Sequence, residues 1–140
     1  MDSEYISEWF RFGDMDLDTA ELLLSHRPQH LEIICYHCQQ AAEKYLKGYL
    51  SSRGVEEIPK THNLIQLCIL CASEDKRFTE TMEHCSFLTP FGVQPRYPEE
   101  IYIEDRHMKK ALDCARQIKA FAPLQEVREK LLEEDQEETP

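Results

Sequence analysis

Apolar residues recur every three or four positions along most of this chain, a spacing that is typical of amphipathic helices. Between residues 31 and 52, one apolar stripe contains Ile34, Cys38, Ala41, Tyr45 and Tyr49. A second stripe beside it contains Cys35, Ala42, Leu46 and Leu50. A helix that is apolar over so much of its circumference is usually the central helix of a bundle. The polar strip that remains is either a solvated face or the wall of a site, and it contains His37, Gln40, Lys44, Lys47 and Ser51.

The same spacing, interrupted by proline and glycine, predicts five helices over residues 3–25, 29–52, 62–72, 76–88 and 104–122. Ser3 and Thr61 are suitable N-cap residues, and Gly54 stands where helices commonly end. Proline and glycine residues between positions 89 and 103 exclude a single helix there. We therefore expect an all-α, up-down bundle of about five helices with a long irregular loop before the last helix.

We expect the bundle to occupy residues 1–123 and an acidic, mobile tail to occupy residues 124–140. The net charge of −11 is concentrated in part in this tail. A surface of this charge does not attract nucleic acid broadly, so any nucleotide or RNA contact requires a local basic pocket. No apolar run is long enough to span a bilayer, and the first residues are acidic, so we expect a cytoplasmic location without membrane contact.

Two cysteine pairs, Cys35-x-x-Cys38 and Cys68-x-x-Cys71, have the spacing of zinc ligands. Zinc ribbons and fingers place such pairs on turns, whereas both pairs here lie within predicted helices. We therefore expect the cysteines to be small core residues, with neither metal nor disulfide. The chain has no glycine-rich phosphate loop and no HExxH motif, and no cofactor is expected.

Several stretches, read in order, resemble the HEPN domain family. They are Gln39-Gln40-Ala41-Ala42-Glu43-Lys44-x-Leu46-Lys47, Thr61-His62-Asn63-Leu64-x-x-Leu67 and Arg96-Tyr97-Pro98, preceded by Trp9-x7-Leu17-x2-Ala20-x2-Leu23-Leu24. The resemblance implies a helical bundle that pairs into a homodimer and binds a nucleotide or RNA. It also implies a minimal nucleotidyltransferase as partner, often in a toxin–antitoxin pair.

One branch of the family consists of metal-independent ribonucleases with an Arg-x4–6-His motif near the start of the last helix. Arg96 stands at about that place, but isoleucine or tyrosine occupies each position where the histidine would follow. The pair Arg77-x6-His84 satisfies the motif, yet one such match is expected by chance in a chain of this composition. We therefore favour a protein that is not an enzyme, and a ribonuclease toxin using Arg77 and His84 is the alternative.

The candidate nucleotide-binding residues are Gln40, Lys44, Lys47, His62, Arg96 and Tyr97. Cations and a helix N-terminus favour a phosphate, and an aromatic ring beside an arginine suits a base. Structural explanations compete with this one, since Glu43 and Lys47 have the spacing of a solvated helix ion pair. A third possibility is a pure protein-interaction module whose acidic tail binds a basic partner.

Overall fold

The computed structural model describes residues 2–93 and 102–138 of the 140-residue chain, and these residues form helices without any strand. The six α-helices are α1 (Ser3–His26), α2 (Leu31–Ser52), α3 (Leu64–Glu74), α4 (Met82–Leu88), α5 (Asp105–Lys119) and α6 (Ala122–Glu138). Two short 3-10 helices, η1 (Lys76–Thr81) and η2 (Thr89–Gly92), flank α4. The all-α bundle predicted from the apolar spacing is confirmed.

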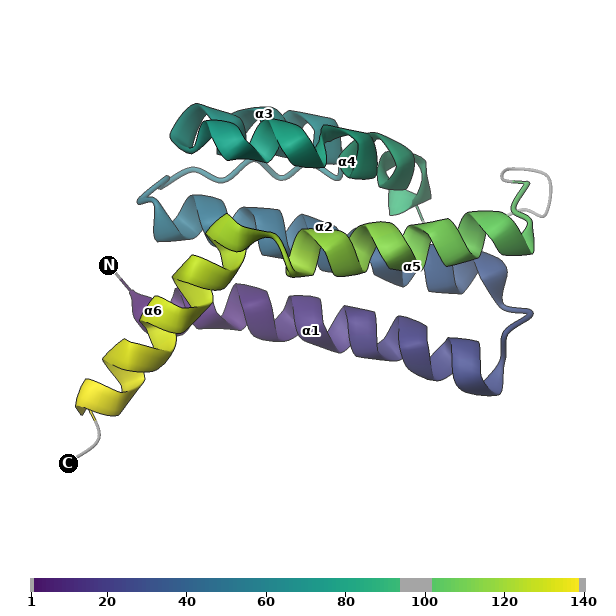
Figure 1. Cartoon of the computed structure of the whole chain (residues 1–140), viewed down its shortest axis with the longest axis horizontal. Coiled ribbons are helices and arrows are strands. Elements are labelled where there is room, and N and C mark those ends of the chain that lie inside the picture. Colours follow the sequence, from purple (N-terminus) through teal and green to yellow (C-terminus); the bar gives the residue numbers. More distant parts are fainter. Residues whose placement is uncertain (1, 94–101, 139–140) are drawn as a thin grey trace.

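Helix α2 lies at the centre of the bundle and contacts each of the other five α-helices. In Figure 1, α1 lies on one side of α2, α3 and α4 lie on the other, and α5 runs across the front. The segment between α2 and α3 turns back beside the C-terminal part of α2 before α3 begins. The two apolar stripes of α2 are buried almost completely, as its predicted central position requires.

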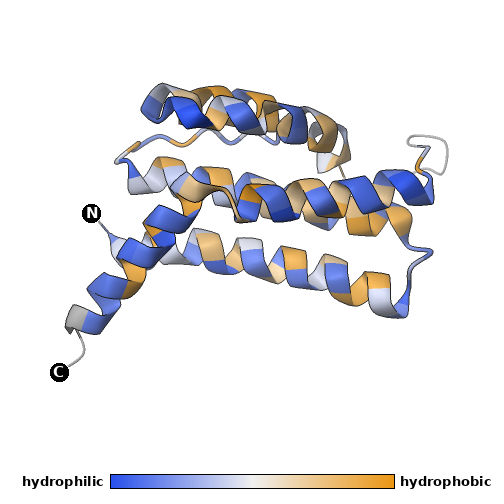
Figure 2. Ribbon diagram, in the orientation of Figure 1, coloured by the Kyte–Doolittle hydropathy of each residue, from blue (hydrophilic) through white to orange (hydrophobic). Residues whose placement is uncertain are grey.

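The core is built from the facing apolar bands of the helices, which Figure 2 shows in orange. All six cysteines are buried within it as free thiols, which confirms the prediction that they are small core residues. Gly13 allows α1 to approach α2 closely, because a Cβ at this position would lie 2.7 Å from Cε1 of the buried Tyr45 ring. Gly13 is therefore a packing position between α1 and α2.

Several helix boundaries differ from the predicted ones because other side chains provide the caps. Asp2, not Ser3, caps α1 by accepting a hydrogen bond from the Tyr5 backbone N–H. Asn63, not Thr61, caps α3, and its Oδ1 accepts from the N–H groups of the two residues after Leu64. The hydroxyl of Thr61 instead accepts from the Asn63 N–H, so this residue shapes the preceding turn.

The region predicted as one helix over residues 76–88 is divided into η1 and α4. The Asp75 carboxylate accepts from the Arg77 N–H and starts the 3-10 turn.

Helix α6 occupies most of the segment that we expected to be a tail. Leu124 and Leu131 are buried against the bundle, while the rest of α6 is largely hydrophilic (Figure 2). Arg128 forms a two-pronged ion pair with Asp14 of α1, which also accepts a hydrogen bond from the Tyr45 hydroxyl at 2.7 Å. These contacts attach the first half of α6 to the bundle, and Figure 1 shows its far end extending away from it.

Among the described residues, none of the helices combines the length and the apolar character needed to cross a membrane.

Candidate functional site

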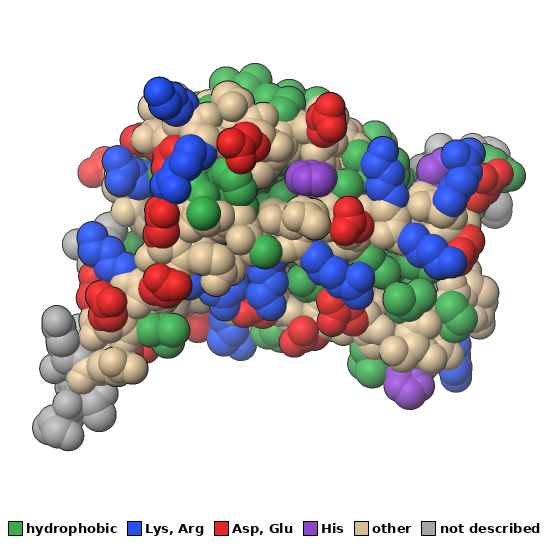
Figure 3. Space-filling view, in the orientation of Figure 1, with side chains coloured by type: hydrophobic (Ala, Val, Ile, Leu, Met, Phe, Trp, Pro, Cys, Tyr) green, Lys and Arg blue, Asp and Glu red, His purple; other side chains and the backbone are tan. Residues whose placement is uncertain are grey.

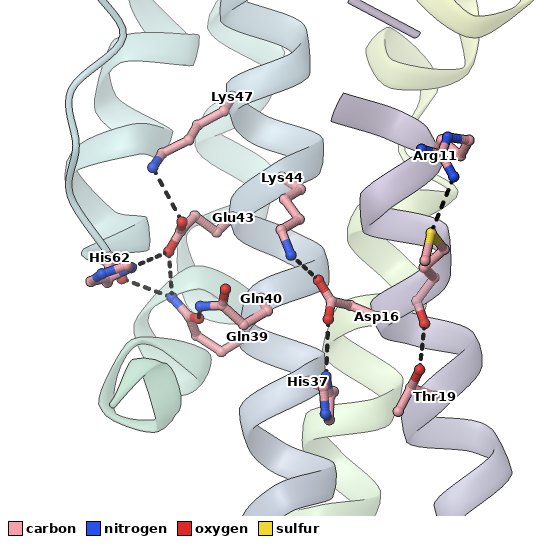
Figure 4. Close-up of polar contacts among 11 residues, drawn as sticks. Arg11, Asp16, Thr19, His37, Gln39, Gln40, Glu43, Lys44, Lys47 and His62 are labelled. Atoms are coloured by element: carbon pink, nitrogen blue, oxygen red, sulfur yellow. Dashed lines mark hydrogen bonds and ion pairs between the residues drawn. The ribbon is translucent and has the colours of Figure 1, made fainter. Parts of the chain in front are cut away.

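The polar strip of α2 divides into two separate clusters, which Figure 4 shows on opposite sides of the helix. In the first, which we call the Glu43 cluster, Glu43 is 5% exposed and its carboxylate accepts from Lys47 Nζ at 3.1 Å. The other carboxylate oxygen lies 2.8 Å from Nδ1 of His62, a residue of the loop before α3. Gln39, fully buried, donates to the His62 carbonyl oxygen at 2.8 Å.

The Glu43 cluster fastens the loop before α3 onto the central helix. Its members come from two of the stretches that carry the resemblance, the one that begins at Gln39 and the one that begins at Thr61. Gly92, which precedes the Arg96-Tyr97-Pro98 stretch in the sequence, also lies against the cluster. A Cβ on Gly92 would lie 2.9 Å from Nε2 of Gln39, so the chain passes directly over this side chain. The Glu43–Lys47 pair expected on a solvated face therefore exists, but it is buried.

The second cluster connects α2 to α1. Lys44 forms an ion pair with Asp16, and the other Asp16 oxygen lies 2.9 Å from Nδ1 of His37. Partial burial acts to raise the pKa of the Asp16 carboxyl, but the hydrogen bonds from His37 and Lys44 outweigh it and lower that pKa below its usual value. Lys44 is therefore committed to a partner within the fold.

The structure thus brings together only part of the predicted nucleotide-binding set. Lys47 and His62 meet at Glu43, and Gln40 joins them by donating to Gln39 at 2.8 Å. Lys44 faces the opposite side, toward α1 (Figure 4). Arg96 and Tyr97 lie outside the described residues.

A groove with a volume of about 500 Å³ lies beside the Glu43 cluster. Its walls are the rings of Tyr5 and Trp9 from the first turns of α1, Lys47 of α2, and the segment 55–60 with Lys60 at its end. The two rings meet edge to face with centroids 6.1 Å apart, and the Lys47 ammonium lies 6.0 Å from the Trp9 ring. The groove therefore combines aromatic surface with two cations.

Electrostatics limit what this groove can hold. Glu56 and Glu57 share it with the two lysines, so its charge is mixed. The opposite face of the molecule, where α5 and α6 lie in front (Figure 3), also has cations and carboxylates interspersed. This arrangement suits one small anion with an apolar or aromatic part better than an RNA strand.

Arg77 and His84 occupy different elements, η1 and α4. The Arg77 guanidinium donates to Asp75 and, with two further bonds of 3.0 and 2.8 Å, to Glu126 of α6. Both carboxylates raise the pKa of Arg77, with the hydrogen bonds to Glu126 as the largest cause. Within the described part of the chain, His84 has no hydrogen bond or ion pair.

Sequence reasoning did not select Tyr5, Trp9 or Glu43 as site residues. Trp9 and Glu43 stand inside the stretches that carry the resemblance, so their position was a usable signal. Tyr5 and Lys60 lie more than 50 positions apart, and only the path of the segment after α2 brings them to one groove.

Comparisons with known proteins agree with this architecture. The model of the HEPN domain matches residues 6–129. The crystal structure of ST0689, an archaeal HEPN homologue, superposes with a TM-score of 0.64 at 23% identity over 90% of this chain and 97% of that one. TT1696 from Thermus thermophilus gives a TM-score of 0.71 at 24% identity, over 87% and 97%. No curated protein matches this chain. Since the family model covers most of the sequence, the chain belongs to the HEPN domain family.

Proposed function

We propose that this HEPN-domain protein is not a catalyst, that it binds a nucleotide in the groove beside the Glu43 cluster, and that it works as a homodimer with a minimal nucleotidyltransferase. The observation that carries the nucleotide site is the position of Lys47. Its side chain is 8% exposed, and its ammonium has three donors but only one hydrogen bond among the described residues, to Glu43. Donors that remain free at the wall of a groove are suited to a phosphate.

The other walls supply what the rest of a nucleotide requires. The Trp9 ring lines the groove and offers an aromatic surface for a base. Lys60 adds a second cation for the phosphate, and Glu56 and Glu57 can accept hydrogen bonds from ribose hydroxyls. His62 supports the site indirectly, because it holds the carboxylate that positions Lys47.

Calorimetric titration of the full chain with ATP tests this site, with adenosine and inorganic phosphate as separate arms. Lys47→Met and Lys60→Ala should each weaken ATP binding by about tenfold or more, since each removes a phosphate contact. Lys44→Ala is the matched control, because Lys44 belongs to the same helix but pairs with Asp16 on its other side. Absence of ATP binding by the unmodified chain, or equal losses in Lys44→Ala and Lys47→Met, would contradict the proposal.

The partner is tested separately, by purifying the tagged chain together with a minimal nucleotidyltransferase encoded beside its gene. For a toxin–antitoxin pair we expect the two proteins to form a stable complex. We also expect one of them to inhibit growth when it is expressed alone, and the other to relieve this inhibition. Separate elution of the two proteins in gel filtration would exclude this part of the proposal.

The absence of catalysis is tested by incubating the chain with RNA. The guanidinium of Arg77 is held by Asp75 and Glu126, so we expect no cleavage. RNA cleavage that disappears in both His84→Ala and Arg77→Lys would establish the ribonuclease alternative.

A further inference from the structure

The outer face of α1 carries an apolar stripe that no other part of the described chain covers. Eight large apolar side chains are strongly exposed in the described residues, and four of them lie on this helix. These are Tyr5, Phe12, Met15 and Leu22, with exposed fractions of 52%, 43%, 49% and 60%. The opposite face of α1 packs into the core.

The spacing of this stripe is that of a helix–helix seam. Tyr5 and Phe12 are seven residues apart, as are Met15 and Leu22, and Phe12 precedes Met15 by three. Alternating steps of three and four residues place side chains along one line of a helix and match the seam positions of a left-handed helix pair. Glu8 and Thr19 complete the same line.

We infer that this stripe is the surface through which two copies of the chain associate, with their α1 helices antiparallel; the inference deepens the homodimer named in the proposed function. In an antiparallel pair, Tyr5 lies opposite the partner's Leu22, and Phe12 lies opposite the partner's Met15. In this register the four exposed apolar side chains of each copy lie opposite apolar side chains of the other, and Glu8 lies opposite the partner's Thr19. The stripe is therefore complementary to itself.

Charge at the edge of the stripe selects a second copy in the same register. Arg11 and Asp18 are seven residues apart on one flank. Antiparallel pairing brings each Arg11 beside the partner's Asp18, so two ion pairs form across the two-fold axis. Arg11 lies 4.7 Å above its own Phe12 ring and bonds to Glu8, which keeps its guanidinium at the seam.

The expected strength follows from size and charge. A single helix pair buries less area than most permanent dimers, so we expect micromolar association. Each copy carries a net charge of −11, and this long-range repulsion is screened by salt. Association should therefore strengthen as ionic strength rises.

Sedimentation velocity of the full chain over a concentration series tests the inference. Phe12→Glu and Leu22→Glu should each weaken association by about tenfold or more. Ile69→Glu is the control, since Ile69 is 57% exposed on α3 and outside the stripe. Circular dichroism confirms that each variant is folded, and all of these positions are exposed.

An exchange of charges tests the register itself. Arg11→Glu and Asp18→Arg should each weaken the dimer, and the double variant should restore it, because the crossed ion pairs form again with opposite sign. A monomeric unmodified chain, equal effects of Ile69→Glu and Phe12→Glu, or a double variant no better than the single ones would overturn the inference. Because ATP titration of Phe12→Glu is independent of this measurement, failure of the dimer and failure of the nucleotide site are distinguishable.

Discussion

At the scale of single residues, the buried carboxylate of Glu43 organises the predicted site. It accepts from Lys47, His62 and, at 3.4 Å, Gln39. Glu43→Gln leaves the buried Lys47 ammonium without a counter-charge, so we expect a loss of about 2–3 kcal/mol in the free energy of unfolding. Urea denaturation measures it, with the exposed Glu133→Gln as control. Equal stability of the two variants would show that the cluster is not structural.

A second residue-scale prediction concerns Gly13. Alanine is favoured over glycine inside a helix by about 1 kcal/mol, which alone predicts a gain. The new methyl group would lie 2.7 Å from a Tyr45 ring that is 1% exposed and tied to Asp14 through its hydroxyl. Overpacking of this kind costs about 1–3 kcal/mol, so Gly13→Ala should lower the thermal midpoint. Ser86→Ala, on an exposed position of α4, should leave it nearly unchanged, and a stabilised Gly13→Ala would refute the close approach of the two helices.

At the scale of elements, the attachment of α6 should depend on pH through Asp14. Partial burial acts to raise the pKa of the Asp14 carboxyl, but hydrogen bonds from Arg128 and Tyr45 outweigh it and lower that pKa. A lowered pKa in the folded state stabilises the fold above the ordinary carboxyl pKa of about 4, and this stabilisation is lost as pH falls through the lowered value.

Asp14→Asn should therefore cost about 1–2 kcal/mol near neutral pH, and the difference from the unmodified chain should shrink toward zero in acid. Unfolding free energies measured by urea titration at several pH values check this, with the exposed Glu129→Gln as control. A difference that stays constant with pH would rule out the charged form of Asp14 as its cause.

Elements also show what the sequence could predict. Apolar spacing located α1, α2 and α5 well, because each buries a continuous stripe. It did not find the division into η1 and α4, since the Asp75 cap that starts the 3-10 turn leaves the apolar spacing unchanged. It also underestimated α6, which buries Leu124 and Leu131 and forms ion pairs with Arg77 and Asp14, residues distant in the sequence.

At the scale of the whole molecule, the resemblance to the HEPN domain family correctly predicted the fold, because the motif residues themselves build it. Gln39, Glu43 and His62 bond to one another and hold the loop before α3. The candidate site was harder to predict for the same reason. Helical spacing grouped Lys44 with Lys47, but their partners, Asp16 and Glu43, draw them to opposite sides of α2.

The proposed role of the molecule depends above all on nucleotide binding in the groove between α1 and the segment after α2. Amide chemical shifts of the full, isotope-labelled chain, followed by NMR while ATP is added, report on this groove residue by residue. We expect saturable shifts at Tyr5, Trp9, Lys47 and residues 55–60, and none at the hollow formed by Arg77, Glu126 and the end of α2. Absence of saturable shifts, or shifts centred on Arg77, would contradict nucleotide binding in this groove.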